Sequence, residues 1–526
     1  MFVSLGSSGL LGVEYLSAYL RRAGHRVSLV HDPALFNDRF DLNSPWLAEK
    51  LDVRHKVVAR ILELKPDVLA FSCITAVFKW SVEIAAAVRK VRHVPVVMGG
   101  VHSSAIPGFV LGYDEVDFAV VSEGEEALLA LVEDLAAGRN GAGIPSVWHK
   151  ADGIPTPPPS VNRFIADLDG LPFPDKEIYA PFRPPRGRYD ALTARGCPYR
   201  CTYCFNNFFA ELPSEGTFRD YNRRRSVENV LEELRIAKKR WNFGYVEFHD
   251  DIFTMNRPWL EDFLPKYEAQ IGRPFVCHAH ARFIDVSLAR LLKRAGCIRL
   301  KMGVQSLDSM AYRQRVLKRA EREGDLGKAI DACNEAGIAL DADHIVGLPG
   351  ESDEGRKNAL RFYQAHTPTR IGAYWLAFYP GIEMTLAAHA AGDITDAELD
   401  KIYRGEMSGI HQAHALTEEY RREETINRGY VAAYNLLPLL PPRARALLDP
   451  EVLSKVPGVE RASRYAAAAG MLRPVNLARG RELIQYLRHY THNLVGPGRH
   501  ALDLRGSHEP TAGAILPDEL MSTAAK

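Results

Sequence analysis

The segment "TARGCPYRCTYCFNN" (193–207) places Cys197, Cys201 and Cys204 within eight positions, with a glycine before them and aromatic residues between them. The chain has 526 residues and only seven cysteines, an odd number, and no secretory signal is evident at its start. We therefore expect reduced thiols that act as metal ligands, nucleophiles or core residues, and not disulfides. Three thiols at this spacing are compatible with a zinc site, a redox pair or an iron–sulfur cluster.

The spacing of the three cysteines separates these possibilities. Zinc usually takes four ligands, commonly as two separated pairs, and this loop offers no fourth cysteine or histidine. A dithiol redox site would use Cys201 and Cys204 and leave Cys197 idle. A cluster held by three thiolates uses all of them and leaves one iron open for a small chelating molecule. The sequence favours the cluster.

Composition limits the classes of partner. The 66 Lys and Arg residues and 65 Asp and Glu residues give a net charge of +1, so no overall field attracts nucleic acid or an anionic membrane. No apolar run reaches the roughly 18 residues of a membrane span. The N-terminus lacks the basic region of a signal peptide, so a cytoplasmic location is expected. The length predicts roughly three domains.

Residues 1–140 alternate short buried-strand patterns with helical stretches. The strands are expected at 26–30, 67–72, 95–100 and 117–124, and the helices between them at 13–24, 81–91 and 125–138. This alternation predicts an α/β, doubly wound (Rossmann-like) parallel sheet. Ligands bind such sheets at the carboxyl ends of the strands, so "FSCITA", "GGVHSS" and "SEGEE" should share one edge.

Three further regions are expected along the chain. Residues 141–187 form a Pro-rich connector that includes "IPTPPPS" and "PFRPPRGR". Residues 188–395 contain six strand–helix units, which predicts a partial (β/α)6 barrel with its chemistry at the carboxyl ends of the strands. Residues 396–526 read as a mainly helical C-terminal domain that caps the substrate, with a loose tail. Its His489 and His492 are candidate substrate contacts, although residues at helical spacing are more often core.

The cysteine array resembles the cluster loop of the radical S-adenosylmethionine (radical SAM) superfamily, including the aromatic residue Tyr203 before the third cysteine. In that family the unique iron of a [4Fe–4S] cluster binds the amino and carboxylate groups of SAM, and one electron releases a 5′-deoxyadenosyl radical. The resemblance implies that the backbone around Tyr203 contacts the adenine.

The resemblance extends to later strands of the predicted barrel. In "EFHDDIFT" (247–254), Asp250 and Asp251 are candidates for the SAM amino group, as a carboxylate facing an ammonium, although either could instead cap a helix. The other SAM candidates that the resemblance implies are Gln305 and Ser306 in "GVQSLD" (303–308), Ile345 in "HIVGLPGES" (344–352) and Arg282 in "HARFID" (280–285). A structural salt bridge is the alternative role for Arg282.

The first 140 residues resemble the cobalamin-binding domain that precedes the barrel in one large class of radical SAM enzymes. The glycines at the N-terminus do not form G-x-G-x-x-G, so a dinucleotide site is disfavoured. Small residues at the strand ends would let the backbone approach a bulky corrin. The implied contacts are Gly9, Leu10, Ser72, Cys73, Ile74, Thr75, Gly99, Gly100, Val101, His102, Ser122, Glu123 and Gly124.

The domain departs from the D-x-H-x-x-G pattern that supplies a histidine to cobalt. The nearest segment, "DADHIVG" (341–347), has Ala342 in place of the aspartate and belongs to the barrel. The resemblance therefore implies base-off cobalamin without a histidine ligand, its lower face meeting the loop that contains Cys73. That thiol is a possible cobalt ligand, but a buried free cysteine is the favoured interpretation.

The resemblance implies a cobalamin-dependent radical SAM C-methyltransferase that acts on a small molecule and takes electrons from a reductant such as flavodoxin or ferredoxin. Oxidative cyclisation or ring rearrangement with the same cofactors is the alternative. An RNA methylthiotransferase is disfavoured, because its N-terminal domain carries cluster cysteines and this one has only Cys73; no nucleic-acid partner is expected. A non-enzymatic corrinoid carrier or zinc-stabilised interaction protein would leave the barrel motifs unexplained.

Overall fold

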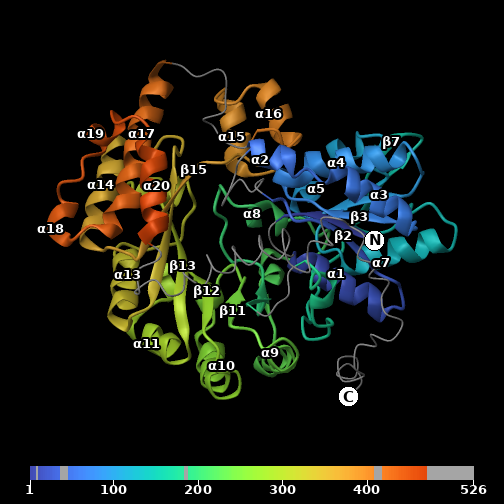
Figure 1. Ribbon diagram of the computed structural model, residues 1–526, viewed down its shortest axis with the longest axis horizontal. Coiled ribbons are helices and arrows are strands. Elements are labelled where there is room, and N and C mark those ends of the chain that lie inside the picture. Colours follow the sequence, from blue (N-terminus) through green and yellow to red (C-terminus); the bar gives the residue numbers. More distant parts are fainter. Residues whose placement is uncertain (7–9, 36–44, 183–186, 408–417, 471–526) are drawn as a thin grey trace.

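The computed structural model describes residues 1–6, 10–35, 45–182, 187–407 and 418–470, and confirms the predicted α/β class. Two α/β units lie side by side, one from the N-terminal third of the chain and one from its middle (Figure 1). Within the described residues, every helix is too short or too polar to cross a lipid bilayer.

The N-terminal sheet has seven strands in the order β2-β1-β3-β4-β5-β6-β7, and its first five are parallel. The parallel strands are β1 (Phe2–Leu5), β2 (Leu29–Asp32), β3 (Leu69–Ser72), β4 (Val96–Gly99) and β5 (Phe118–Val120). β1 was not predicted as a strand, although its position between β2 and β3 leaves Phe2 and Val3 almost fully buried. The order is that of a doubly wound sheet, in which helices cover both faces.

Helices cover the two faces of this sheet. They are α1 (Leu11–Arg22), α2 (Pro45–Lys50), α3 (Arg54–Leu64), α4 (Thr75–Arg89), α5 (Val101–Ala105), α6 (Pro107–Leu111) and α7 (Glu125–Ala136). Apolar side chains of α1 and α7 form one core with the sheet, and those of α3, α4 and α6 form a second core. Both faces are therefore buried, and the carboxyl edge is the part of the sheet available to a ligand.

The predicted connector begins with a hairpin that extends the N-terminal sheet. Strands β6 (Val147–Ala151) and β7 (Ile154–Thr156) pair antiparallel, and β6 also pairs antiparallel with β5. Asp152 and Gly153 form the turn, both with positive φ, as expected for an Asp-Gly hairpin. Further along, Asp175 accepts a hydrogen bond from Ser17 (2.7 Å), which ties the connector to α1.

The second unit is a six-stranded, all-parallel sheet in the order β15-β14-β13-β12-β11-β8. Its strands are β8 (Arg188–Ala191), β11 (Tyr245–Phe248), β12 (Phe275–Ala279), β13 (Cys297–Gln305), β14 (Ala339–Val346) and β15 (Arg370–Trp375). The helices of this unit are α9 (Val227–Trp241), α10 (Arg257–Gln270), α11 (Val286–Arg294), α12 (Met310–Arg315), α13 (Asp325–Ala336) and α14 (Asp353–Ala365).

Side chains alternate across this sheet. Apolar residues such as Phe248, Cys277 and Leu300 face the helices and form the largest core. Polar residues such as Asp190, Glu247 and Lys301 lie between them along the same strands, on the opposite face. The predicted strands of the barrel are therefore present, with a charged inner face.

Short elements complete the part of the unit near the cysteines. Strands β9 (Ala194–Arg195) and β10 (Arg223–Arg224) pair antiparallel, and helix α8 (Asn206–Phe209) follows the cysteine loop. The short 3-10 helices are η1 (Lys176–Ile178), η2 (Phe218–Tyr221), η3 (Phe253–Met255), η4 (Ala281–Phe283) and η6 (Leu437–Leu439).

The chain after β15 is helical as far as it is described. Its helices are α15 (Glu383–Ala391), α16 (Asp396–Tyr403), α17 (Glu418–Leu436), α18 (Pro442–Arg445), α19 (Pro450–Ser454) and α20 (Val459–Gly470). The α16 segment lies against the N-terminal unit, where Lys79 pairs with Glu406 at 2.8 Å, whereas α17 packs beside β15 (Figure 1). His489 and His492 lie outside the described residues.

Candidate active site

The cysteine loop runs from β9 to α8 and is anchored by backbone contacts. Gly196 has a φ of +88°, and a Cβ there would lie 2.0 Å from the Tyr221 carbonyl oxygen, so only glycine fits. Thr202 donates to the Val316 carbonyl through its hydroxyl (2.9 Å), and its own carbonyl accepts from the Met384 backbone N–H (2.9 Å). The loop is thereby fixed to the β13 and β15 ends of the barrel.

The three thiols fit a cluster better than a single ion. Among the described residues, the only three His, Cys, Asp or Glu side chains whose ligand atoms all lie within 4.8 Å of one another are Asp190, Glu247 and His249. Cys197, Cys201 and Cys204 are therefore spaced too widely to share one zinc ion, whereas each cluster thiolate binds a different iron.

The electrostatics of the loop call for a bound cation. Burial raises the pKa of the Cys197 and Cys204 thiols to about 12, and Asp251 and the neighbouring thiols act in the same direction. Thiolates at these positions therefore need positive charge beside them, which iron supplies. All three residues are free thiols and half-buried, so the donor set fits the cluster.

The two aspartates after β11 have different surroundings. Asp250 is fully buried and accepts hydrogen bonds from the Thr193 backbone N–H (2.6 Å) and hydroxyl. Asp251 accepts a hydrogen bond from the Asn206 side chain (3.0 Å), and burial raises its pKa. Asp251 also lines a cavity of about 420 Å³ beside the loop. Asp251 is therefore the carboxylate of the two that a ligand can reach.

Other candidate SAM residues gather at the β13 and β14 ends. The Tyr203 hydroxyl accepts from Arg319 (2.6 Å), and Arg319 also donates to the Gly303 carbonyl (2.8 Å). The Tyr203 ring shares an apolar cluster with Ile345. Gln305 has a positive φ of 65°, an uncommon conformation that places the turn after β13 under local strain.

Ser306 and Arg282 lie in contrasting environments. Ser306 is fully buried, and its hydroxyl donates to Glu351, whose pKa burial raises to about 7. Arg282 is exposed and lies close enough to Tyr199 to lower the pKa of that phenol, against the larger effect of burial. Sequence reasoning missed Arg319 and Glu351, although Glu351 lies inside the "HIVGLPGES" segment.

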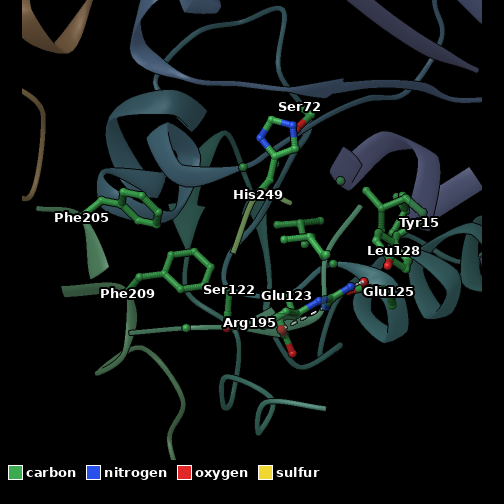
Figure 2. Close-up of a pocket in the computed structure, with 18 of the residues that line it drawn as sticks. Tyr15, Ser72, Ser122, Glu123, Glu125, Leu128, Arg195, Phe205, Phe209 and His249 are labelled. Carbon is green, nitrogen blue, oxygen red and sulfur yellow. Dashed lines mark hydrogen bonds and ion pairs between the residues drawn. The ribbon is translucent and has the colours of Figure 1, made fainter. Parts of the chain in front are cut away.

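A cavity of about 420 Å³ opens between the two α/β units. Figure 2 shows Ser72 and Ser122 of the N-terminal unit in the same cavity as His249, Phe205 and Phe209 of the barrel unit. Its lining follows the carboxyl ends of β3, β4, β5, β8 and β11 and continues along α1 and α7. The cavity is thus the place where the predicted ligand edges of both sheets meet.

Six of the predicted cobalamin residues line this cavity: Ser72, Gly99, Gly100, Ser122, Glu123 and Gly124. Gly100 has a φ of +91°, and a Cβ there would lie 2.7 Å from the Cys73 carbonyl oxygen. Ser122 has a positive φ of 69°. Small side chains and tight turns leave the backbone of these loops open to a large ligand, which fits a corrin and its tail.

Of the other predicted cobalamin residues, those that the structure describes are not part of the cavity lining. Burial raises the pKa of Cys73 to about 12 and lowers that of His102 to about 4, so both are neutral near pH 7. His102 Nδ1 lies 3.1 Å from the Thr75 hydroxyl. Ile74 is 48% exposed, which leaves an apolar side chain at the tip of the β3–α4 loop. Leu10 and Val101 are half-buried, and Gly9 lies outside the described residues.

An ion-pair cluster joins the cavity loop after β5 to the strand before the cysteines. Arg195 contacts Glu123 (3.0 Å) and Glu125 (2.6 Å), and Arg223 contacts Glu123 (2.8 Å). Figure 2 shows Arg195 between the two carboxylates. Burial acts to raise the pKa of Glu123, but the two guanidinium groups hold it below its ordinary value. No local pattern in the sequence indicates this contact, because its partners are about 70 and 100 residues apart.

Family models match both units. The B12 binding domain model matches residues 6–132, and the Radical SAM superfamily model matches residues 192–363. An uncharacterised methyltransferase of Pyrococcus horikoshii is 25% identical over 368 residues, 67% of this chain and 72% of its own length. The anaerobic magnesium-protoporphyrin IX monomethyl ester cyclase of Rubrivivax gelatinosus is 26% identical over 390 residues, 70% of this chain and 64% of its own length.

Solved structures share the fold of both units. The radical SAM methyltransferase TsrM from Kitasatospora setae, with cobalamin and a [4Fe–4S] cluster bound, is similar with a TM-score of 0.63 and 18% identity, over 92% of this chain and 98% of its own. The cobalamin-dependent SAM radical enzyme OxsB, with aqua-cobalamin and SAM bound, gives a TM-score of 0.64 and 16% identity, over 96% of this chain and 74% of its own.

The matched domains lie on the two sides of the cavity, and the thiol set and the open strand ends fit the cofactors of each. The chain therefore contains a B12 binding domain followed by a domain of the Radical SAM superfamily, and these two domains imply cobalamin, a [4Fe–4S] cluster and SAM as its cofactors.

Proposed function

We propose that this enzyme transfers a methyl group to an unactivated carbon of a small molecule, inside the cavity between its two α/β units. One observation carries the proposal: the cavity has Ser72, Gly99 and Gly100 on one side and Asp251 beside the cysteine loop on the other. When bound, the cluster and SAM supply a 5′-deoxyadenosyl radical and cobalamin supplies the methyl group. The chain brings the two together and keeps water away.

We assign different residues to the cluster, to SAM and to cobalamin. We assign Cys197, Cys201 and Cys204 to three irons and Asp251 to the amino group of SAM, as a charge-assisted contact. The backbone at Tyr203 and the side chain of Ile345 would border the adenine. Gln305 and Ser306 would lie near the ribose and carboxylate, with Arg282 as a second contact for the carboxylate. The six cavity-lining residues of the N-terminal unit would hold cobalamin.

The proposed domain limits follow the same division. We propose residues 1–140 for cobalamin, 188–395 for the radical chemistry and 396–526 for closing the substrate side, with 141–187 as the connector. A one-electron reductant such as flavodoxin or ferredoxin would bind outside the cavity.

A second candidate is oxidative cyclisation or ring rearrangement without methyl transfer. The similarity to the cyclase of Rubrivivax gelatinosus favours it, because that relative matches 70% of this chain and carries a cyclase name. The methyltransferase relative of Pyrococcus horikoshii favours the first proposal.

The test is anaerobic reconstitution with iron, sulfide and cobalamin, followed by reduction with methyl-labelled SAM. We expect 5′-deoxyadenosine to form and the label to reach the bound cobalamin. Deoxyadenosine without any label on cobalamin would favour the cyclisation candidate. Well-folded protein that assembles no cluster and forms no deoxyadenosine would contradict both.

A matched pair of cysteine variants controls the reconstitution. Cys201→Ala should lose cluster absorbance and deoxyadenosine formation. Cys333→Ala should keep both, because Cys333 is a residue of α13 buried in a core that contains no residue of the cysteine loop.

A further inference from the structure

A second polar group lies beside the cavity, on the inner face of the barrel. Asp190 of β8 pairs in register with Glu247 of β11, and His249 follows two residues later. Their ligand atoms all lie within 4.8 Å of one another, a spacing that could hold a metal ion. Of the three, His249 also lines the cavity between the two units.

The charges around this group argue against a metal ion. Arg188 contacts Asp190 at 2.7 Å and Glu247 at 3.0 Å, and Lys301 contacts Glu247 at 2.6 Å. Arg188 and Lys301 hold the pKa of Glu247 well below its ordinary value, against the effect of burial. The two carboxylates are thus already neutralised by Arg188 and Lys301. These cations are part of the chain and would repel a divalent ion.

The hydrogen bond between His249 and Asp190 fixes the tautomer of the imidazole. His249 Nε2 lies 2.8 Å from Asp190 Oδ1, and an ionised carboxylate only accepts, so Nε2 carries the hydrogen. Nδ1 is then a lone-pair acceptor. No described residue hydrogen-bonds Nδ1, and the side chain is 32% exposed. His249 Nδ1 is therefore an oriented acceptor on the barrel side of the cavity, which Phe205 and Phe209 also line (Figure 2).

We propose that the Asp190–His249 pair recognises the methyl acceptor: His249 Nδ1 accepts a hydrogen bond from an N–H or O–H group of that substrate. If that group ionises, its proton moves to Nδ1, its electron pair stays on the nitrogen or oxygen, and Asp190 compensates the imidazolium. Asp190 is the positioning residue, which orients the imidazole, and His249 contacts the substrate. That this substrate accepts a methyl group rests on the proposed function. The hydrogen bond between Asp190 and His249, and the orientation of the imidazole, do not depend on it.

The acceptor is tested with two small probes, phenol and anisole, which differ in the O–H donor. The reconstituted protein, with cluster and cobalamin bound, is labelled with ¹⁵N and ¹³Cε1 in histidine, and the His249 signals are assigned by their loss in His249→Gln. We expect the Nε2–H tautomer, and a saturable shift of the Nδ1 signal with phenol that is at least fivefold larger than with anisole. Asp190→Ala should mix the tautomers and weaken the phenol response severalfold.

The surface pair His389–Asp396 is the matched control, because His389 Nε2 also lies 2.8 Å from its aspartate and its side chain is 33% exposed. Its signals should respond to neither probe. Equal responses of His249 to phenol and anisole, or none, would overturn the proposal. So would a stoichiometric divalent metal that His249→Gln removes, or a change in the cobalamin absorbance spectrum in that variant, since Nδ1 would then be a ligand. None of these readings depends on methyl transfer, so they fail independently of the proposed function.

Discussion

Glu123 and Arg195 form an ion pair of 3.0 Å across the boundary between the cobalamin-binding domain and the barrel. Glu123 belongs to the loop that lines the cavity after β5, and Arg195 lies two residues before Cys197. Arg223 binds the same carboxylate, so one side chain of the first domain holds both strands of the β9–β10 ribbon. The loop that lines the cavity after β5 is therefore tied directly to the strand that leads into the cysteine loop.

Glu123→Gln should loosen this boundary. The substitution leaves Arg195 and Arg223 with less compensation in a largely buried place, so we expect a loss of about 3 kcal/mol in the free energy of unfolding. Cobalamin affinity and cluster occupancy should fall together. Thermal unfolding, cobalamin titration and iron content measure the three effects. Glu126→Gln, at an exposed position on α7, is the control and should change none of them.

The two aspartates after β11 should separate binding from stability. Asp251→Asn should weaken SAM binding at least tenfold, as expected for the loss of a charge-assisted contact, with little change in melting temperature. Asp250→Asn should instead lower stability by about 2 kcal/mol, because its buried carboxylate accepts from Thr193 and faces Arg224 at 3.7 Å. Equilibrium dialysis of SAM with the reconstituted enzyme and thermal unfolding give the comparison. The reverse pattern would reassign the ligand-facing carboxylate to Asp250.

Gly100→Ala should disrupt the end of β4. Both its φ of +91° and the 2.7 Å approach to the Cys73 carbonyl oxygen oppose a side chain, so we expect a loss of about 3 kcal/mol and much weaker cobalamin binding. Gly143→Ala is a matched control, since it has a φ of +76° and nothing within 4 Å of the added Cβ. It should lose only about 1 kcal/mol and bind cobalamin normally. Equal effects would mean that conformation alone, and not the close approach, requires the glycine.

Glu351 should make the stability of the apoprotein fall between mildly acidic and neutral pH. Burial raises the pKa of Glu351 from 4.5 to about 7, although the Ser306 hydrogen bond opposes this. Between these two values the native protein keeps a Glu351 proton that the unfolded chain has released, so the contribution of Glu351 to stability falls as the pH rises through this range. Glu351→Gln should remove this dependence. The free energy of unfolding of the variant, measured relative to the wild type, should be about 2 kcal/mol higher at pH 8 than at pH 5. Denaturant unfolding at the two pH values measures it, and parallel curves for the variant and wild type would contradict the assignment.

Local patterns predicted most of the fold and the ligand-facing edges. The buried strands of the first 140 residues, their small residues at the carboxyl ends and the cysteine spacing are all properties of a few neighbouring positions. The hairpin at Asp152 and Gly153 was missed inside the Pro-rich connector, although its turn chemistry is local and could have indicated it. Strand β1 was missed although it is as long as β3 and β4, which were predicted, and its first three residues are buried.

The contacts that the sequence did not indicate are non-local. Arg195, Arg319 and His249 act through partners in other loops, helices or strands, and an isolated arginine or histidine carries no pattern that identifies such a partner. Burial also separated residues that looked equivalent. Asp250 and Asp251 are adjacent and identical in type, yet one is enclosed by Thr193 and the other lines the cavity.

The meeting of two carboxyl edges at one cavity has a consequence for how such enzymes diversify. Much of the polar and glycine lining of the cavity lies in loops after the strands, such as Ser122, Glu123 and Gly124, although core residues such as Ala70 and Val97 also line it. Insertions and substitutions at the rim can reshape what the cavity admits without disturbing either core. A single scaffold can thus change its substrate while the cofactor-binding sites stay unchanged.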